Sequence, residues 1–306
     1  MAFLRTPEGV AMTQTGTPAA GADTAVLSYA GLPNEQVSAA NGFDYAFRQY
    51  GPATRPLILF QHFRGNLDNW DPALLDRLAA SRRVIAFDNV GVGGTSGTTP
   101  DSVRQMATDA LAYLDALGID EMDLLGFSLG SFVAQEVALV RPWAVRRLVL
   151  ASSAPQGAWG MHGWAPEVIA AVGSRMGNPA GYLDVFYSSS EASRSAGMAS
   201  LQRMSSRNED RDAATSWQTR LAQYDAVCDW GIPNDVLVHR VTSIAIPVFV
   251  ANGDSDPMIL PRYSHLLAGL IPDVRLKIYS DAAHGFLFQH HEEFARDVLN
   301  FLSEDP

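Results

Sequence analysis

Short apolar runs alternate with helix-like segments along most of the chain. Seven such runs, most of them continuously apolar, predict β-strands at 43–51, 56–61, 83–88, 122–127, 146–152, 246–253 and 274–280. Helical spacing predicts helices at 101–118, 129–140 and 291–302, with Asp101 as the N-cap of the first and Gly118 as its stop. Strands that alternate with helices favour an α/β fold, in which helices cover both faces of a mostly parallel sheet.

One long segment breaks this alternation. Residues 155–240 contain no apolar strand pattern and are instead helical and rich in aromatic side chains. We therefore predict a helical cap at 155–240, inserted after the sixth strand between two parts of one core, 29–154 and 241–306. A cap of this kind usually roofs a pocket, so the pocket is expected to be largely apolar, with Trp159 and Trp164 as candidate substrate contacts.

Composition narrows the class of protein. With 47% hydrophobic residues, 18% charged residues and no apolar run long enough to span a membrane, the chain is expected to be soluble and cytoplasmic. A net charge of −11 disfavours nucleic acid and anionic membranes as partners. Residues 1–28 lack a secretory apolar core and are predicted to be a flexible leader. The oligomeric state stays open, and a homo-oligomer is compatible with the sequence.

No cofactor or metal is expected. Cys228 is the only cysteine, so neither a disulfide within the chain nor a site of paired thiolates can form. The histidines at 290 and 291 have no neighbours at metal-ligand spacing. The segment "DNVGVGGTSG" at 88–97 has the glycines of a phosphate-binding loop only in part, because the third glycine is missing at the required spacing.

A serine between two glycines lies at the end of the strand predicted at 122–127. In "GFSLG" the chain turns from strand to helix at Ser128, which requires a strained backbone, and side chains at Gly126 and Gly130 would clash. The turn presents the Ser128 hydroxyl at the positive end of the helix, next to the N–H of Leu129. Ser128 is therefore a candidate nucleophile.

A serine nucleophile needs a general base and a carboxylate that orients it. The loop after the strand at 246–253 offers Asp254 and Asp256, and the loop after the strand at 274–280 offers His284. Loops at the carboxyl ends of parallel strands open onto one edge of the sheet, so these side chains can meet Ser128 there.

With these motifs the chain resembles the α/β-hydrolase superfamily from about residue 43 to 303. The resemblance implies that "GFSLG" is the nucleophile elbow, that Asp256 in "GDSDP" is the acid in preference to Asp254, and that His284 in "AAHGF" is the base. A serine at position 128 argues against the epoxide hydrolase and dehalogenase branches, which use a carboxylate there.

The resemblance also implies an oxyanion hole. Its two N–H donors would belong to Leu129 and to Phe63, in the loop "QHFRGN" where the family usually has His-Gly-x. His62 takes the place of the glycine and either lines the pocket or shapes the loop. Arg64 is unusual beside the hole, and it either binds an anionic group of the substrate or forms an ion pair with Asp68 or Asp71.

The sequence thus predicts a capped serine hydrolase that cleaves a carboxylic ester of a small to medium, largely apolar substrate. The same three side chains allow hydrolysis of a carbon–carbon bond, lactone hydrolysis or cofactor-free peroxide chemistry. A receptor for small molecules that does not turn them over is the remaining alternative.

Overall fold

A computed structural model describes residues 28–175 and 178–304. An eight-stranded sheet forms the centre of the molecule, and its strands lie in the order β1-β2-β4-β3-β5-β6-β7-β8. The strands are β1 (Glu35–Ser38), β2 (Asp44–Tyr50), β3 (Pro56–Phe60), β4 (Arg83–Phe87), β5 (Met122–Phe127), β6 (Val145–Ala151), β7 (Val248–Gly253) and β8 (Val274–Tyr279). Strand β2 runs antiparallel to β1 and β4, and the other pairs are parallel. The mostly parallel α/β sheet is confirmed.

The strand β1 was not predicted. It is short and polar, and its side chains alternate between partly buried and exposed positions at the edge of the sheet. An edge strand of this kind has no continuous apolar run, because it lacks the two buried faces of strands such as β3 and β5.

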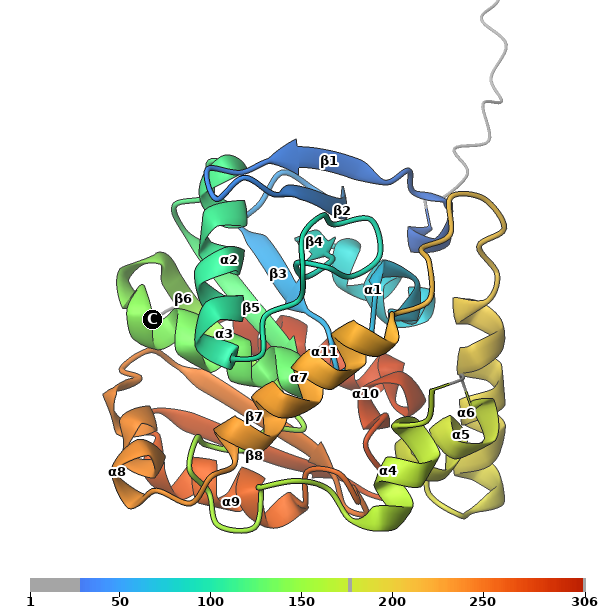
Figure 1. Cartoon of the computed structure of the whole chain (residues 1–306), viewed down its shortest axis with the longest axis vertical. Coiled ribbons are helices and arrows are strands. Elements are labelled where there is room, and N and C mark those ends of the chain that lie inside the picture. The colour runs from blue at the N-terminus through green and yellow to red at the C-terminus, as the bar shows by residue number, and fades with distance from the viewer. Residues whose placement is uncertain (1–27, 176–177, 305–306) are drawn as a thin grey trace, which may run out of the picture.

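Helices cover both faces of the sheet. Figure 1 shows α2 (Val103–Ala116) and α3 (Leu129–Val140) in front of the sheet, and α1 (Pro72–Ala79) and α11 (His291–Ser303) behind it. The prediction that Asp101 caps α2 is wrong, because Ser102 is the N-cap and its hydroxyl accepts a hydrogen bond from the N–H of Gln105. The remaining helices of the core are α9 (Pro261–Leu270) and α10 (Phe286–Gln289), and the short 3-10 helices are η1 (Tyr29–Gly31), η2 (Leu67–Asn69), η3 (Pro142–Ala144) and η4 (His239–Ser243).

The segment between β6 and β7 is helical, as its sequence pattern indicates. It forms α4 (Pro166–Val172), α5 (Pro179–Phe186), α6 (Glu191–Met204), α7 (Trp217–Trp230) and α8 (Asp235–Val238). Figure 1 shows α4, α5 and α6 together at the lower right, α7 crossing in front of the sheet, and α8 at the lower left. The leader predicted for residues 1–28 lies, except for Ser28, outside the described residues.

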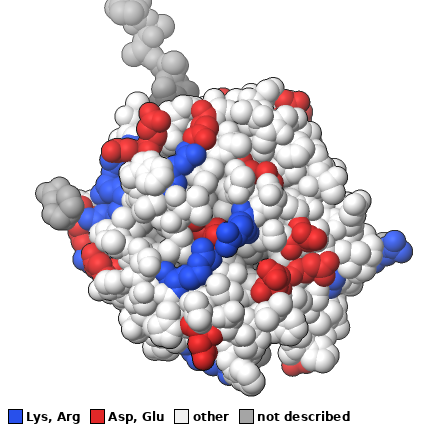
Figure 2. Space-filling model, turned by 60° about the vertical axis from the view of Figure 1, so that its left-hand side comes forward, with Lys and Arg blue, Asp and Glu red and all other residues white. Residues whose placement is uncertain are grey.

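Charged side chains on the surface are mixed. Figure 2 shows one face of the molecule on which acidic and basic side chains are interspersed with uncharged surface. Such mixing is typical of a solvated protein surface. In the part of the chain that the structure describes, no helix is long and apolar enough to cross a membrane.

Candidate active site

The turn between β5 and α3 holds Ser128 in a strained conformation. Its φ is +57° and its ψ is −123°, outside the regions that side chains other than glycine usually adopt. A Cβ on Gly126 would lie 2.5 Å from the carbonyl oxygen of Gly130, and a Cβ on Gly130 would lie 2.2 Å from the carbonyl oxygen of Phe60. The two glycines therefore allow the turn to close and α3 to start directly against the end of β3.

This close approach leads to a first prediction. Gly130→Ala is expected to lower the free energy of unfolding by about 3 kcal/mol, because the new Cβ meets backbone atoms that cannot yield. The control is Gly269→Ala in α9, where a Cβ has no neighbour within 4 Å. There alanine is expected to raise the free energy of unfolding by at most about 1 kcal/mol. Chemical denaturation of both variants measures the difference. Equal effects would contradict the close contact at Gly130.

His284 lies between a carboxylate and a hydroxyl. Its Nδ1 is 2.8 Å from Oδ2 of Asp256, and its Nε2 is 2.9 Å from Oγ of Ser128. All three side chains are at most 1% exposed. Because a carboxylate only accepts hydrogen bonds, Nδ1 carries the proton and Nε2 is free to accept one from the serine. The three side chains are thus joined in one chain of hydrogen bonds.

The two aspartates after β7 have different roles. Oδ1 of Asp256 accepts hydrogen bonds from the N–H groups of Met258 and Ile259, which fix its carboxylate toward His284. Asp254 instead accepts from the N–H groups of Asp281 and Ala282. The structure therefore places Asp256 next to His284, whereas Asp254 holds the loop that carries His284.

The N–H groups of Phe63 and Leu129 belong to two segments that lie side by side. Leu129 is the first residue of α3, and Phe63 follows β3 by three residues. A Cβ on Gly130 would come within 2.7 Å of the Gln61 carbonyl oxygen, so the two segments touch. Among the described residues neither the Phe63 nor the Leu129 N–H has a hydrogen-bond acceptor, and both can serve a ligand.

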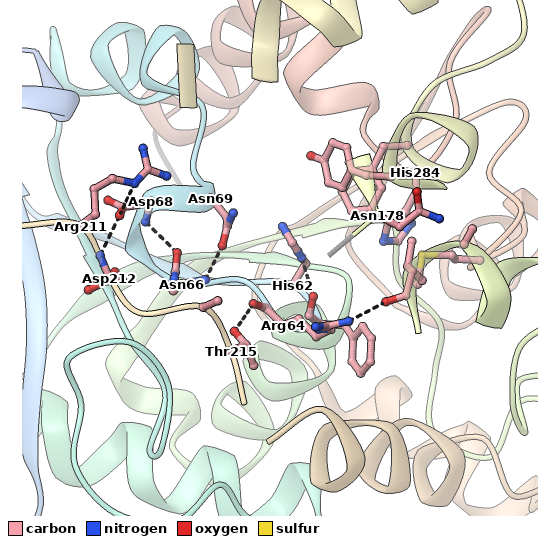
Figure 3. A pocket seen from close by; sticks show the side chains of 17 residues that line it. His62, Arg64, Asn66, Asp68, Asn69, Asn178, Arg211, Asp212, Thr215 and His284 are labelled. Atoms are coloured by element: carbon pink, nitrogen blue, oxygen red, sulfur yellow. Dashed lines mark hydrogen bonds and ion pairs between the residues drawn. The ribbon is translucent and has the colours of Figure 1, made fainter. Parts of the chain in front are cut away.

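A cavity of about 480 Å³ opens beside these groups. His284, His62, Phe63, Phe186 and Met258 line one part of it, and a mixture of polar, charged and apolar side chains lines the rest. Figure 3 shows Asp68, Arg211 and Asp212 at the end opposite His284, with His62 and Arg64 between. The cavity predicted to be largely apolar thus also carries polar side chains, and most of these come from loops rather than from the aromatic helices.

The polar end of the cavity is preorganised by its own contacts. Asp68 accepts hydrogen bonds from Arg48, at 2.7 Å, and from the N–H of Asp212, at 2.9 Å. Arg211 lies 3.9 Å from the Asp68 carboxylate. Burial, together with the nearby charge of Asp68, raises the pKa of Asp212. These contacts tie the loop between α6 and α7 to the loop after β3.

Arg64 does not form the predicted ion pair with Asp68 or Asp71. Its φ is +64°, and its guanidinium donates to the carbonyl oxygens of Val172 and Ser174, at 3.1 and 2.8 Å. Asp71 is instead bound by Arg203, and Asp68 by Arg48. Arg64 thus holds the carboxyl end of α4, where a positive charge is favourable, and also lines the cavity.

The two tryptophans suggested as substrate contacts do not line the cavity. Trp159 is 81% exposed and is not among the residues that line the cavity. Trp164 packs behind the cavity wall, with its ring 4.9 Å from that of Phe63 and 5.1 Å from that of Tyr224. Of these two ring partners, Phe63 lines the cavity.

His62 both lines the cavity and shapes the loop. Its Nδ1 lies 2.8 Å from the Phe63 carbonyl oxygen, and its ring packs edge-on against Phe127 and Phe186. Burial lowers the pKa of His62 from 6.5 to about 4, and the nearby His284 contributes in the same direction. The ring is therefore neutral at neutral pH.

The lowered pKa of His62 predicts a loss of stability in acid. The unfolded chain takes up a proton on His62 near pH 6.5, whereas the folded chain takes it up only near pH 4. Unfolding is therefore favoured progressively as the pH falls from 6.5 to 4, by about 3 kcal/mol for this group. Denaturation at pH 7 and pH 4 should show a smaller acid loss for His62→Phe than for the wild type. Equal losses would contradict the lowered pKa.

Several residues of the cavity were not predicted. Asn178, Tyr182 and Phe186 come from α5 and its N-cap, and Asp212 and Thr215 come from the loop between α6 and α7. They belong to no motif, and only the packing of the inserted helices brings them to the cavity. Within 28–175 and 178–304 no group of three or more metal-binding side chains gathers.

Comparison with known proteins places the chain in a family. Residues 55–291 match the family described as the alpha/beta hydrolase fold, and the chain belongs to this family. A solved structure, an alpha/beta hydrolase fold protein from Chitinophaga pinensis, is 41% identical, covers 91% of this chain and 100% of its own, and superposes with a TM-score of 0.85. The family assigned from the motifs is thereby confirmed.

Two curated relatives match the chain over very different shares of their own length. The poly(3-hydroxyalkanoate) depolymerase of Ectopseudomonas oleovorans is 29% identical over 268 residues, which cover 85% of this chain and 88% of that protein. The polyketide synthase ThaQ of Burkholderia thailandensis is 30% identical over 239 residues, which cover 74% of this chain. The match spans only 11% of that much longer protein.

Proposed function

We propose that the protein is a serine hydrolase that cleaves carboxylic esters through an acyl-enzyme on Ser128. The observation that carries this proposal is the position of His284, hydrogen-bonded to Asp256 on one side and to Ser128 on the other. This arrangement, at the edge of a cavity, is what a hydroxyl nucleophile requires.

In the first half of the reaction, the Ser128 hydroxyl attacks the ester carbonyl while Nε2 of His284 takes its proton. The N–H groups of Phe63 and Leu129 hold the oxyanion of the tetrahedral intermediate. The intermediate collapses, the bond to the alcohol breaks, and His284 returns the proton to the leaving oxygen. Asp256 keeps the Nδ1 proton in place and stabilises the imidazolium.

In the second half, water attacks the acyl-enzyme and His284 takes its proton. The bond from the acyl carbon to Ser128 breaks, the serine recovers its proton, and a carboxylic acid leaves. The net reaction consumes one water molecule and yields an acid and an alcohol, so no cofactor enters it. The cavity of about 480 Å³ suits a small to medium substrate.

The proposal is tested with p-nitrophenyl esters of increasing acyl length. We expect saturable release of nitrophenolate from the shorter esters and a decline once the acyl chain outgrows the cavity. Failure to turn over any ester in the series would overturn ester hydrolysis as the function. Labelling of Ser128 by a fluorophosphonate in that case would show that the nucleophile is active on a different carbonyl substrate.

One observation favours a second candidate function, the hydrolysis of a carbon–carbon bond next to a ketone in an acidic substrate. Arg64 lines the cavity, and among the described residues no carboxylate forms an ion pair with it. Burial lowers the pKa of Arg64, and the positive charge of the neighbouring Arg220 contributes in the same direction. A carboxylate on the substrate would relieve this excess positive charge. Turnover of a ketone-bearing dienoate, without turnover of neutral esters, would favour this candidate.

A further inference from the structure

One buried nitrogen in the cavity wall has no hydrogen-bond partner. Nδ1 of His62 faces the Phe63 carbonyl oxygen, which can only accept, so the ring proton lies on Nδ1 and Nε2 keeps its lone pair. Nε2 is buried and unpaired among the described residues. Figure 3 shows it on the side of the His62 ring away from the dashed contact.

This nitrogen lies close to the reacting groups. The rings of His62 and His284 pack against the same two phenylalanine rings. From the centroid of the Phe127 ring, the His62 and His284 ring centroids lie 5.2 and 5.0 Å away. From the centroid of the Phe186 ring, they lie 5.3 and 5.1 Å away. His62 also precedes Phe63 directly in the chain. An unpaired buried acceptor at this point is costly in the free protein, and a ligand that donates a hydrogen bond to it recovers that cost.

We propose that Nε2 of His62 accepts a hydrogen bond from a hydroxyl group on the α or β carbon of the acyl part of the substrate. The inference rests on the proposed ester hydrolysis and names its substrate class, the hydroxyacyl esters. The hydroxyl is placed on the α or β carbon because the N–H of Phe63, the residue next to His62, holds the ester carbonyl oxygen in the proposed reaction.

The chemistry of the surroundings selects a neutral donor. A carboxylate or a ketone has no proton to give at neutral pH, and an alkyl chain leaves the nitrogen unpaired. An ammonium group would meet the positive charge of Arg64, which lies nearer to His62 in Figure 3 than the carboxylates of Asp68 and Asp212 at the opposite end of the cavity. A hydroxyl group can donate the hydrogen bond and needs no charged partner.

The test compares p-nitrophenyl butanoate with its 2-hydroxy and 3-hydroxy analogues. Each kcat/KM is divided by the rate of spontaneous hydrolysis of the same ester, which removes differences in intrinsic reactivity. We expect the wild type to prefer one hydroxylated ester by about tenfold. In His62→Phe, which keeps a ring but has no acceptor, the preference should fall to about twofold or less. The control variant His265→Phe, at an exposed position of α9, should leave the wild-type preference for the hydroxylated ester unchanged.

Three results would overturn the inference: a wild type without preference for either hydroxylated ester, a preference that survives in His62→Phe, or an equal loss on all three esters in that variant. The wild-type comparison stands even if His62→Phe does not fold. Titration of Ser128→Ala with methyl butanoate and its two hydroxy analogues, followed by NMR, separates the inference from the reaction. Tighter binding of a hydroxylated ester would support it even without hydrolysis, and equal binding would overturn it.

Discussion

Ser128→Ala is expected to lower kcat/KM for p-nitrophenyl butanoate by about 10⁴-fold or more. The variant loses the hydroxyl oxygen that lies 2.9 Å from Nε2 of His284 and that the proposed mechanism activates. What remains is binding and the two N–H donors of Phe63 and Leu129, which position water far less well than the chain positions its own serine. Initial rates of nitrophenolate release measure the effect.

The matched control is Ser195→Ala, which removes an exposed hydroxyl from α6. This variant should keep the wild-type rate, and circular dichroism should show both variants folded. If Ser128→Ala retained more than about a tenth of the activity, a different group would be the nucleophile and the proposed mechanism would be wrong.

Asp256→Asn is expected to lower kcat by about 10⁴-fold while leaving the fold intact. An asparagine amide can offer its N–H₂ group to His284, which then presents Nδ1 as the acceptor and places the proton on Nε2. The imidazole can no longer accept the proton of Ser128, and the positive charge that forms on it has no carboxylate beside it. Steady-state rates over pH 6 to 9 would show the loss at every pH.

The neighbouring carboxylate supplies the control for this prediction. Asp254→Asn changes the same functional group two residues away, where the carboxylate binds the N–H groups of Asp281 and Ala282. We expect it to cost some stability and less than about tenfold in rate. Equal losses in the two variants would show that the loop, rather than the contact with His284, controls the activity.

The sequence predicted the core of the fold because buried parallel strands have an unmistakable pattern. Strands such as β3 and β5 are buried at every position and mostly apolar, since both faces are covered by helices. The edge strand β1 escaped prediction because solvent on one side allows polar residues and removes that pattern. The N-cap of α2 was misplaced by one residue, since Asp101 and Ser102 are both good capping residues.

The grouping of Ser128, Asp256 and His284 was accessible from sequence for a topological reason. Each follows a parallel strand, so each lies at the same edge of the sheet whatever the rest of the chain does. The choice between Asp254 and Asp256 needed the family resemblance, because both follow the same strand. The hydrogen bonds of the two loops separate them in the structure.

The lining of the cavity could not be predicted because long-range packing determines it. Trp159 looked like a pocket residue because it is aromatic and lies in the insertion, yet it is exposed. Asp212 lines the cavity because its N–H is held by Asp68, 144 positions earlier in the chain. Arg64 binds carbonyl oxygens at the end of α4 rather than Asp68 or Asp71. No sequence pattern determines where this helix lies.

The most direct test of the central claim is to observe the acyl-enzyme. The protein is mixed with p-nitrophenyl acetate, quenched in acid within the first turnovers, and examined by mass spectrometry before and after digestion. The proposed mechanism predicts a mass increase of one acetyl group located on Ser128, and no increase in Ser128→Ala. Turnover without any acylated Ser128, or an acetyl group on another residue, would contradict the mechanism.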